Sequence, residues 1–225
     1  MVEKIFWDDP YRSRLSARVT GVSGETITLD RSIFFAFSGG QESDHGRIGG
    51  QPVLEARKQG REILYRLPPD HDLKPGLAVE VEIDWPRRYR LMQLHFACEI
   101  TLELICQALP GIERIGAHIA ADKARIDFLH QDSLAPLLVG IENAVNRMVQ
   151  DDLPIITGFS DSALERRFWE IDGFARVPCG GTHLKRTGEI GRVHLKRKNP
   201  GRGKERVEVR IDDGASREAA THDDH

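Results

Sequence analysis

The sequence predicts an α+β protein with two folded domains, and three observations support this prediction. Short segments rich in β-branched and apolar residues follow one another over residues 14–84. One long helical pattern follows over residues 87–108, and strand-like and helical segments then alternate. We therefore expect an N-terminal small β-barrel over residues 1–85. An α+β domain over residues 86–212 should follow, with a long helix packed on an antiparallel sheet.

Turn residues separate the N-terminal segments, as the connections between short strands require. The turns are predicted at Ser23-Gly24, Gly49-Gly50, Pro68-Pro69 and Pro75-Gly76. Between them lie the segments ARVTGV, ETITLD, SIFFAF, QPVLEAR, REILYRL and LAVEVEID. Many short strands at regular spacing are typical of a small barrel.

The long helix is predicted to begin at Asp84-Trp85-Pro86, because an aspartate shortly before a proline is typical of a helix start. Apolar or soft positions then recur at spacings of four and three, which places them on one helix face. These positions are Leu91, His95, Cys98, Leu102, Ile105 and Leu109. His95 should therefore lie on the buried side of the helix.

The remaining elements alternate between strand and helix. In chain order we expect strands at 112–120 and 124–130, a helix at 134–149 capped by Asp132-Ser133, a strand at 154–159, a short helix at 161–169, a strand at 174–178 and a basic hairpin over 189–212. Residues 213–225 should form a disordered tail.

Composition excludes several classes of protein. With 40% hydrophobic and 30% charged residues, the chain has the composition of a soluble globular protein, and no apolar run reaches the roughly 20 residues of a membrane helix. Its N-terminus has acidic residues and a proline where a signal peptide would be apolar, so we expect a cytoplasmic protein. Three cysteines, Cys98, Cys106 and Cys179, are too few for a disulfide framework, so each is a buried thiol, a ligand or a nucleophile.

Two pairs of residues could each supply half of a metal site. His95 and Glu99 are four residues apart on the predicted helix and can therefore point the same way. Alone, this pair more often represents a core histidine beside an exposed glutamate. A second pair, Cys179 and His183, lies in CGGTH after a predicted strand, and cysteine and histidine are preferred zinc ligands. Cys98 is a rival ligand, but it points about 100° away from Glu99 around the helix.

These motifs resemble a known family, the alanyl-tRNA editing hydrolases. They comprise the free-standing AlaX proteins, which are related to the editing domains of alanyl- and threonyl-tRNA synthetases. The most specific part is CGGTHLKRTGEIG from Cys179 onward, and Gly39-Gly40-Gln41 with Asp44-His45-Gly46 resembles the family's N-terminal barrel. The family pattern has a second histidine where this chain has Glu99.

The resemblance implies zinc-dependent hydrolysis of serine or glycine wrongly esterified to alanine tRNA. His95, Cys179 and His183 would hold Zn²⁺, while Glu99 either completes the ligand set or steers the attacking water. Gly180 and Gly181 could offer backbone N–H donors to the developing oxyanion. The resemblance also makes Gln41 and Thr182 candidates for substrate binding, although Thr182 could equally tie down its own turn.

A run of basic residues near the end suggests an anionic partner. The candidates for tRNA contact are Lys196, Arg197, Lys198, Arg202 and Lys204. Such a run is as often a solvated hairpin loop, but beside a metal site it could hold phosphates at the acceptor end of tRNA(Ala). We expect no DNA partner and no membrane contact.

Two other functions compete with the hydrolase. The first is a noncatalytic tRNA- or RNA-binding protein in which a structural zinc ion staples the helix to CGGTH; four protein ligands would favour it, and an open position would favour catalysis. The second is a metallopeptidase, which is less favoured because the helix lacks the H-E-x-x-H pattern.

Overall fold

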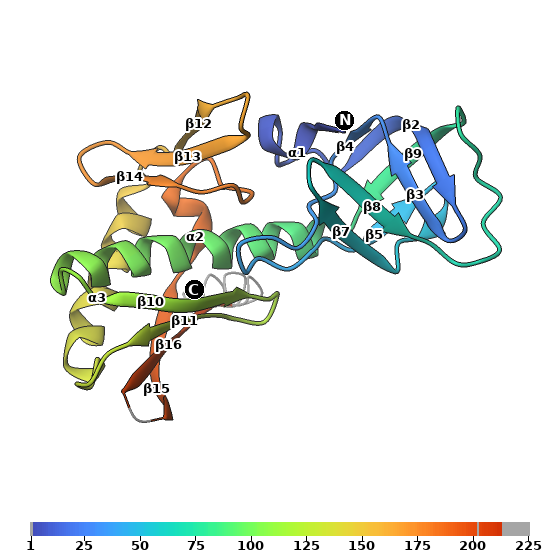
Figure 1. Ribbon diagram of the computed structural model, residues 1–225. Coiled ribbons are helices and arrows are strands. Elements are labelled where there is room, and N and C mark those ends of the chain that lie inside the picture. Colours follow the sequence, from blue (N-terminus) through green and yellow to red (C-terminus); the bar gives the residue numbers. More distant parts are fainter. Residues whose placement is uncertain (1, 202, 213–225) are drawn as a thin grey trace, which may run out of the picture. The chain divides into compact units, whose positions relative to one another are not determined.

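The computed structural model describes residues 2–201 and 203–212 of the chain (Figure 1). Two compact units can be distinguished. The first runs to Met92 and includes Gly180–Thr182, and the second contains Gln93–Cys179 and the chain from His183 onward. Arg202 and the predicted disordered tail, 213–225, lie outside the described residues.

The predicted α+β class is confirmed, because a few helices accompany many strands. In the described residues there are sixteen strands, three α-helices and one 3-10 helix. Across those same residues, none of the helices combines the length and the apolar character that crossing a membrane would require.

The main sheet of the first unit is antiparallel and curled (Figure 1). Strand β2 (Arg14–Ser23) pairs through its first half with β9 (Ala78–Ile83) and through its second half with β3 (Thr26–Leu29). The seven strands lie in the order β6-β5-β9-β2-β3-β8-β7. The remaining four strands are β5 (Gly46–Ile48), β6 (Gln51–Pro52), β7 (Glu55–Gln59) and β8 (Glu62–Arg66). No pairing between the edge strands β6 and β7 occurs among the described residues, so the sheet resembles a half-barrel.

The predicted strand SIFFAF is largely wrong. Only Arg31–Ser32 forms a strand, β4, which pairs in parallel with β1 (Glu3–Lys4) before the short helix α1 (Ile5–Asp8). The segment after Ser32 is buried but irregular, because side-chain oxygens take the N–H groups that a sheet would use. Ser32 Oγ accepts the Phe34 N–H at 2.9 Å, and Asp44 Oδ2 accepts the Phe35 N–H at 2.6 Å.

Helix α2 (Trp85–Ala108) is the longest helix of the described chain. Asp84 Oδ1 accepts the Arg87 N–H at 3.1 Å, which satisfies one of the free donors at the start of the helix. Its middle is buried around most of its circumference and not only along one stripe. The buried apolar positions there are Leu91, Met92, Leu94, Phe96, Ala97, Cys98 and Ile100.

The second unit contains a four-stranded antiparallel sheet in the order β10-β11-β16-β15. Its strands are β10 (Glu113–Ile119), β11 (Ala124–Leu129), β15 (Val193–Gly201) and β16 (Lys204–Ile211). Helix α3 (Ala135–Asp151) lies against β15 and against the 3-10 helix η1 (Thr187–Ile190). Val145 on α3 and Val207 on β16 are fully buried, which places part of the core of this unit here.

A three-stranded antiparallel sheet carries the chain to CGGTH, and it corrects one prediction. Its strands are β12 (Ile156–Asp161), β13 (Arg166–Ile171) and β14 (Ala175–Pro178). The helix predicted over 161–169 is wrong, because Arg167, Trp169 and Ile171 are buried at every second position, as a strand requires.

Candidate metal centre

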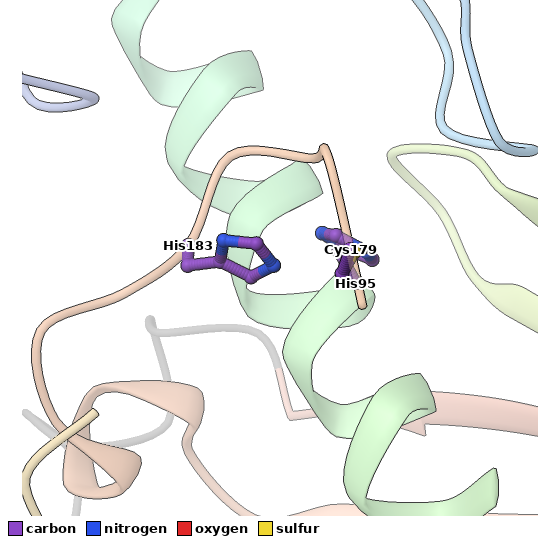
Figure 2. A group of neighbouring side chains, drawn as sticks. All are labelled: His95, Cys179 and His183. Atoms are coloured by element: carbon purple, nitrogen blue, oxygen red, sulfur yellow. Dashed lines mark hydrogen bonds between the residues drawn. The ribbon is translucent and has the colours of Figure 1, made fainter. Parts of the chain in front are cut away.

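Three of the predicted ligands lie together in the second unit. His95 comes from helix α2, while Cys179 follows strand β14 directly and His183 comes four residues later (Figure 2). One ligand atom from each of the three lies within 4.8 Å of the other two. His95 and His183 are nearly enclosed, with 4% and 3% of their surface exposed. The two histidines of this candidate metal site are therefore shielded from water, whereas Cys179 is partly exposed.

Glu99 lies beside this group and approaches two of its members. Its Oε1 atom is 3.3 Å from His95 Nε2 and 3.7 Å from Cys179 Sγ, and His95 Nε2 is 3.4 Å from Cys179 Sγ. Neighbouring ligands of a tetrahedral zinc ion are separated by roughly 3.4–3.6 Å, given metal–ligand distances of about 2.0–2.3 Å. The three atoms therefore lie as close together as ligands of one metal ion can, but Glu99 is not part of the group whose ligand atoms all lie within 4.8 Å of one another.

Trp169 fixes the orientation of the Glu99 carboxylate. The indole N–H of Trp169, a fully buried residue of β13, donates to Glu99 Oε2 at 2.9 Å. The other oxygen, Oε1, is thereby directed toward His95 and Cys179. Hydrogen bonds of this kind from outside a metal site orient its ligands.

The electrostatics of the group favour a positive charge at His95. Burial alone would lower the pKa of His95, but the neighbouring Cys179 and Glu99 side chains outweigh it and raise that pKa well above its ordinary value. Burial would also raise the pKa of Glu99, but the hydrogen bond and charge of His95, with the Trp169 N–H, lower it to about 2. The surroundings of His95 thus favour positive charge at this position, whether a proton or a metal ion carries it.

The side chain of His183 has two properties that metal ligation requires. Its Nε2 atom is buried and has no hydrogen-bond partner in the described part of the chain. Burial, reinforced by the charge of His95, lowers the pKa of His183 well below its ordinary value, so the imidazole is neutral, as metal ligation requires. A buried polar atom without a partner is costly, and a metal ion would remove that cost. The residues present therefore fit a metal ion.

The two glycines of CGGTH lie in backbone conformations that other residues can also adopt. Neither Gly180 nor Gly181 has a positive φ, so a tight left-handed turn is not their reason for being glycine. A Cβ atom added to Gly180 would meet no atom within 4 Å. Open space beside this backbone is compatible with the close approach of another molecule.

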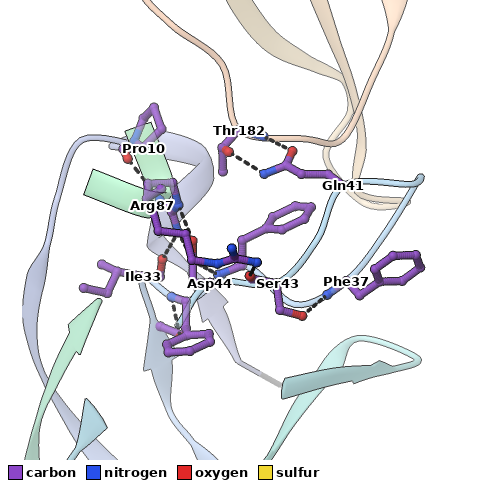
Figure 3. A network of polar contacts seen from close by, with 12 residues as sticks. Pro10, Ile33, Phe37, Gln41, Ser43, Asp44, Arg87 and Thr182 are labelled. Carbon is purple, nitrogen blue, oxygen red and sulfur yellow. Dashed lines mark hydrogen bonds and ion pairs between the residues drawn. The ribbon is translucent and has the colours of Figure 1, made fainter. Parts of the chain in front are cut away.

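Gln41 and Thr182 lie in contact with each other, both within the first unit (Figure 3). Gln41 Nε2 donates to Thr182 Oγ1 at 2.9 Å, and Gln41 Oε1 accepts the Thr182 N–H at 3.4 Å. Gln41 follows a hairpin turn in which Gly39 and Gly40 have φ values of 61° and 91°, a conformation that favours glycine. This geometry accounts for the Gly-Gly-Gln motif.

Asp44 belongs to a buried ion pair and not to a site. Its carboxylate accepts hydrogen bonds from Arg88, which is at the start of helix α2, and neither side chain is exposed. Arg88 also donates to the Ile33 carbonyl at 2.6 Å and to the Pro10 carbonyl at 3.0 Å. This network fixes the loop that carries Gln41 (Figure 3).

The basic candidates divide into exposed lysines and a paired arginine. Lys196, Lys198 and Lys204 are exposed. Arg197 instead points to the other side of β15 and makes two hydrogen bonds to Glu205, at 2.6 Å and 2.5 Å. The charge of Arg197 is therefore offset by a carboxylate, whereas within the described residues no carboxylate lies within ion-pair distance of the three lysines.

Two tryptophans contribute to these surroundings and were missed from the sequence. Trp169 orients Glu99, and Trp7 in α1 donates its indole N–H to the Gly180 carbonyl at 2.8 Å within the first unit. A buried indole must find an acceptor, but the sequence gives no indication of which acceptor it finds. Neither contact could be predicted from spacing along the chain.

Comparison with known proteins places these features in a family. The family model described as the threonyl and alanyl tRNA synthetase second additional domain matches residues 167–208, which include Cys179 and His183. The chain is 30% identical over 213 residues to the alanyl-tRNA editing protein AlaX-M of Pyrococcus horikoshii, covering 93% of this chain and 97% of that protein.

Further relatives include both free-standing proteins and parts of larger enzymes. The alanyl-tRNA editing protein AlaX-M of Methanosarcina mazei is 30% identical over 249 residues, covering 96% of this chain and 99% of that protein. The alanine-tRNA ligase of Staphylothermus marinus is 32% identical over 217 residues, covering 86% of this chain but 24% of the ligase.

Proposed function

Because the chain belongs to the alanyl-tRNA editing family, as its motifs predicted, we propose that it hydrolyses the aminoacyl ester of mischarged tRNA(Ala) in trans. Serine and glycine are the proposed amino acids, and the site is the group around His95, Cys179 and His183. The relatives that match over nearly their full length are named alanyl-tRNA editing proteins, which supports a deacylase.

The observation that carries this proposal is the unsatisfied His183 Nε2 atom within a His-Cys-His group. Nitrogen and sulfur ligands of this kind favour Zn²⁺ among the common metals, so we propose zinc as the ion. Zinc, when bound, would supply Lewis-acid stabilisation of the ester carbonyl or of an attacking water. His95, Cys179 and His183 would hold it, and Glu99 would be either the fourth ligand or the group that orients the water.

The chain's own backbone would provide the remaining requirements of ester hydrolysis. Gly180 and Gly181 lack side chains, so a small aminoacyl group could approach their N–H groups, which would donate to the oxygen that becomes negative. Lys196, Lys198 and Lys204, together with Arg197 and Arg202, are the proposed contacts to the acceptor end of the tRNA. Phosphate contacts of this kind position the substrate without identifying its sequence.

The organisation of the chain completes the proposal. We infer a barrel domain over 1–85, corresponding to the curled sheet, and an editing domain over 86–212, in which the long helix packs on the antiparallel sheet. We also infer that the protein acts in the cytoplasm, where aminoacyl-tRNA is made.

The test is deacylation of seryl- and glycyl-tRNA(Ala), with alanyl-tRNA(Ala) as the correctly charged control and zinc content measured on the same sample. We expect hydrolysis of at least one mischarged substrate and little hydrolysis of the control. His95→Ala should abolish both the activity and stoichiometric zinc, whereas His71→Ala, which removes a histidine of the first unit, should retain both. Intact mischarged tRNA in the presence of zinc-loaded protein would refute the proposed activity.

Glu99 supports one alternative function. With its Oε1 atom close to both His95 and Cys179, four protein ligands could close the site and leave a structural zinc ion in a noncatalytic tRNA-binding protein. Replacing zinc by cobalt and recording the absorption spectrum distinguishes the two cases. A spectrum that responds to small anions indicates an open position and catalysis, whereas an unresponsive spectrum with tRNA binding but no hydrolysis indicates the alternative.

A further inference from the structure

The middle of the CGGTH turn belongs to a different unit from its two ends. Gly180–Thr182 is part of the first unit, whereas Cys179 and His183, which carry the candidate ligand atoms, belong to the second. Peptide bonds join Cys179 to Gly180 and Thr182 to His183. Whatever holds Gly180–Thr182 therefore restricts where the two ligand residues can lie.

Thr182 is held by a side chain from a distant part of the sequence. Gln41 contacts both the hydroxyl and the backbone N–H of Thr182, and both residues are buried, with 1% of their surface exposed. Both ends of the Gln41 amide are used in this pairing, so the side chain is not directed at solvent or at an incoming ester. A hydrogen bond in such dry surroundings is strong and directional.

The loop that carries Gln41 is itself fixed. Its Gly39-Gly40 turn is closed by backbone hydrogen bonds between Ser38 and Gln41, at 3.0 Å and 3.3 Å. Three residues later, Asp44 is locked by the buried Arg88 guanidinium. Gln41 therefore reaches Thr182 from a preorganised support, so the pairing can impose a position on Thr182 rather than follow it.

Trp7 provides a second restraint on the same segment. Its indole N–H donates to the Gly180 carbonyl at 2.8 Å, and Lys4 Nζ lies 5.0 Å from the centre of the Trp7 ring. The turn is thus held near both of its ends, at Gly180 and at Thr182.

We propose that Gln41, assisted by Trp7, is a positioning residue that sets the separation of Cys179 and His183, and that it does not bind the substrate. This inference rests on the proposed function for its relevance to catalysis. It makes its own prediction, however, about the affinity of the tRNA-free protein for zinc. It also gives Thr182 the role of tying down its turn in place of substrate contact.

The experiment measures zinc affinity of the full chain, without tRNA, by competition with a chromogenic chelator. Gln41→Met removes both amide contacts at similar volume, and Thr182→Val removes the hydroxyl alone. Each should weaken zinc binding about ten- to a hundredfold, the usual effect of losing a group that orients metal ligands. The double variant should bind zinc no more weakly than the worse single variant, because both remove one interaction.

Two controls separate positioning from general destabilisation. Thr182→Ser keeps the hydroxyl and should restore affinity close to that of the wild type. Tyr65→Phe removes a different buried hydrogen bond of the first unit, 2.6 Å to Ser32 Oγ, and should leave zinc affinity unchanged.

Trp7→Phe tests the second restraint, because it retains an aromatic ring but loses the indole donor. It should weaken zinc binding less than Gln41→Met because Trp7 is only half-buried.

The zinc affinities of these variants decide whether Gln41 is a positioning residue. Unchanged zinc affinity in Gln41→Met, with or without a higher KM for seryl-tRNA(Ala), would overturn the inference, as would equal weakening in Tyr65→Phe or a wild type that binds no zinc. If Gln41→Met does not fold, the comparison of Thr182→Val with Thr182→Ser gives the same decision. The expected zinc results without any deacylation would leave the positioning role standing and reject the proposed function.

Discussion

At the scale of single residues, the central question is what Glu99 contributes beside three side chains that could hold a metal ion. Its two oxygens face different partners, since Oε2 accepts the Trp169 N–H and Oε1 faces His95 and Cys179. The second contact is an ion pair within the helix, and it also places a carboxylate beside the group that could hold a metal ion. We therefore expect Glu99 to influence the affinity of that group for a metal ion.

Glu99→Gln tests this role while preserving the shape of the site. The amide oxygen can still accept the Trp169 N–H, but the negative charge is lost, so zinc affinity should fall at least about tenfold. Chelator competition measures it, with Glu103→Gln, one turn further along α2, as the matched control. Equal zinc affinity in Glu99→Gln and wild type would reduce Glu99 to a partner of Trp169.

The sequence predicted the separate members of this site better than their surroundings. The spacing of His95 from Glu99 and of Cys179 from His183 follows from local geometry and from a family motif, and the structure brings His95, Cys179 and His183 together. The contacts made by Trp7 and Trp169 join residues that are 173 and 70 positions apart. Such contacts depend on how whole elements pack, and no local pattern encodes them.

At the scale of elements, the local sequence pattern predicted strands correctly where neighbouring strands pair with each other's backbone. It failed where side chains distant in the sequence take the backbone N–H groups. The basic hairpin and the strands around Asp122-Lys123 follow from alternation and turn residues. The segment after Ser32 has strong strand composition, yet Asp44 takes the Phe35 N–H, which a sheet would have paired. Around β13, charged residues concealed the alternation that distinguishes a strand from a helix.

Gly46 shows how a motif residue can have a purely structural reason. It pairs with Ile83 where β5 meets β9, and a Cβ atom at this position would lie 2.1 Å from the Glu82 carbonyl oxygen. The backbone cannot rotate away as a side chain could. Gly46→Ala should therefore lower the free energy of unfolding by about 1–3 kcal/mol, as overpacking does, and urea denaturation measures it.

A second glycine provides the matched comparison for Gly46. Gly140 lies inside helix α3, and an added Cβ atom there would meet nothing within 4 Å. Gly140→Ala should raise the free energy of unfolding by up to about 1 kcal/mol, because alanine favours the helix. If Gly46→Ala were as stable as wild type, the β5–β9 pairing would not be the reason for glycine at this position.

At the scale of the whole molecule, charge is distributed unevenly. The chain carries 32 basic and 35 acidic side chains, a formal charge of -3, which by itself would repel a polyanion. Strand β15 differs from this average, because Lys196 and Lys198 project from the same side of the strand and both are exposed. Arg197 points to the opposite side and is offset by Glu205, whose pKa its hydrogen bonds lower.

This charge distribution predicts which lysine side chains should contact the phosphates of tRNA. Lys196→Gln combined with Lys198→Gln should weaken tRNA binding and reduce the slope of log affinity against log salt by about 2, since each phosphate contact contributes about 1. Lys58→Gln combined with Lys74→Gln removes two exposed lysines of the first unit and should leave the slope unchanged. Filter binding across a salt series measures both. Equal slopes of log affinity against log salt in the wild type and both double variants would exclude β15 as the phosphate-binding surface. A smaller slope in the β15 variant alone would mean that the local positive charge of β15, and not the net charge of the chain, governs tRNA binding.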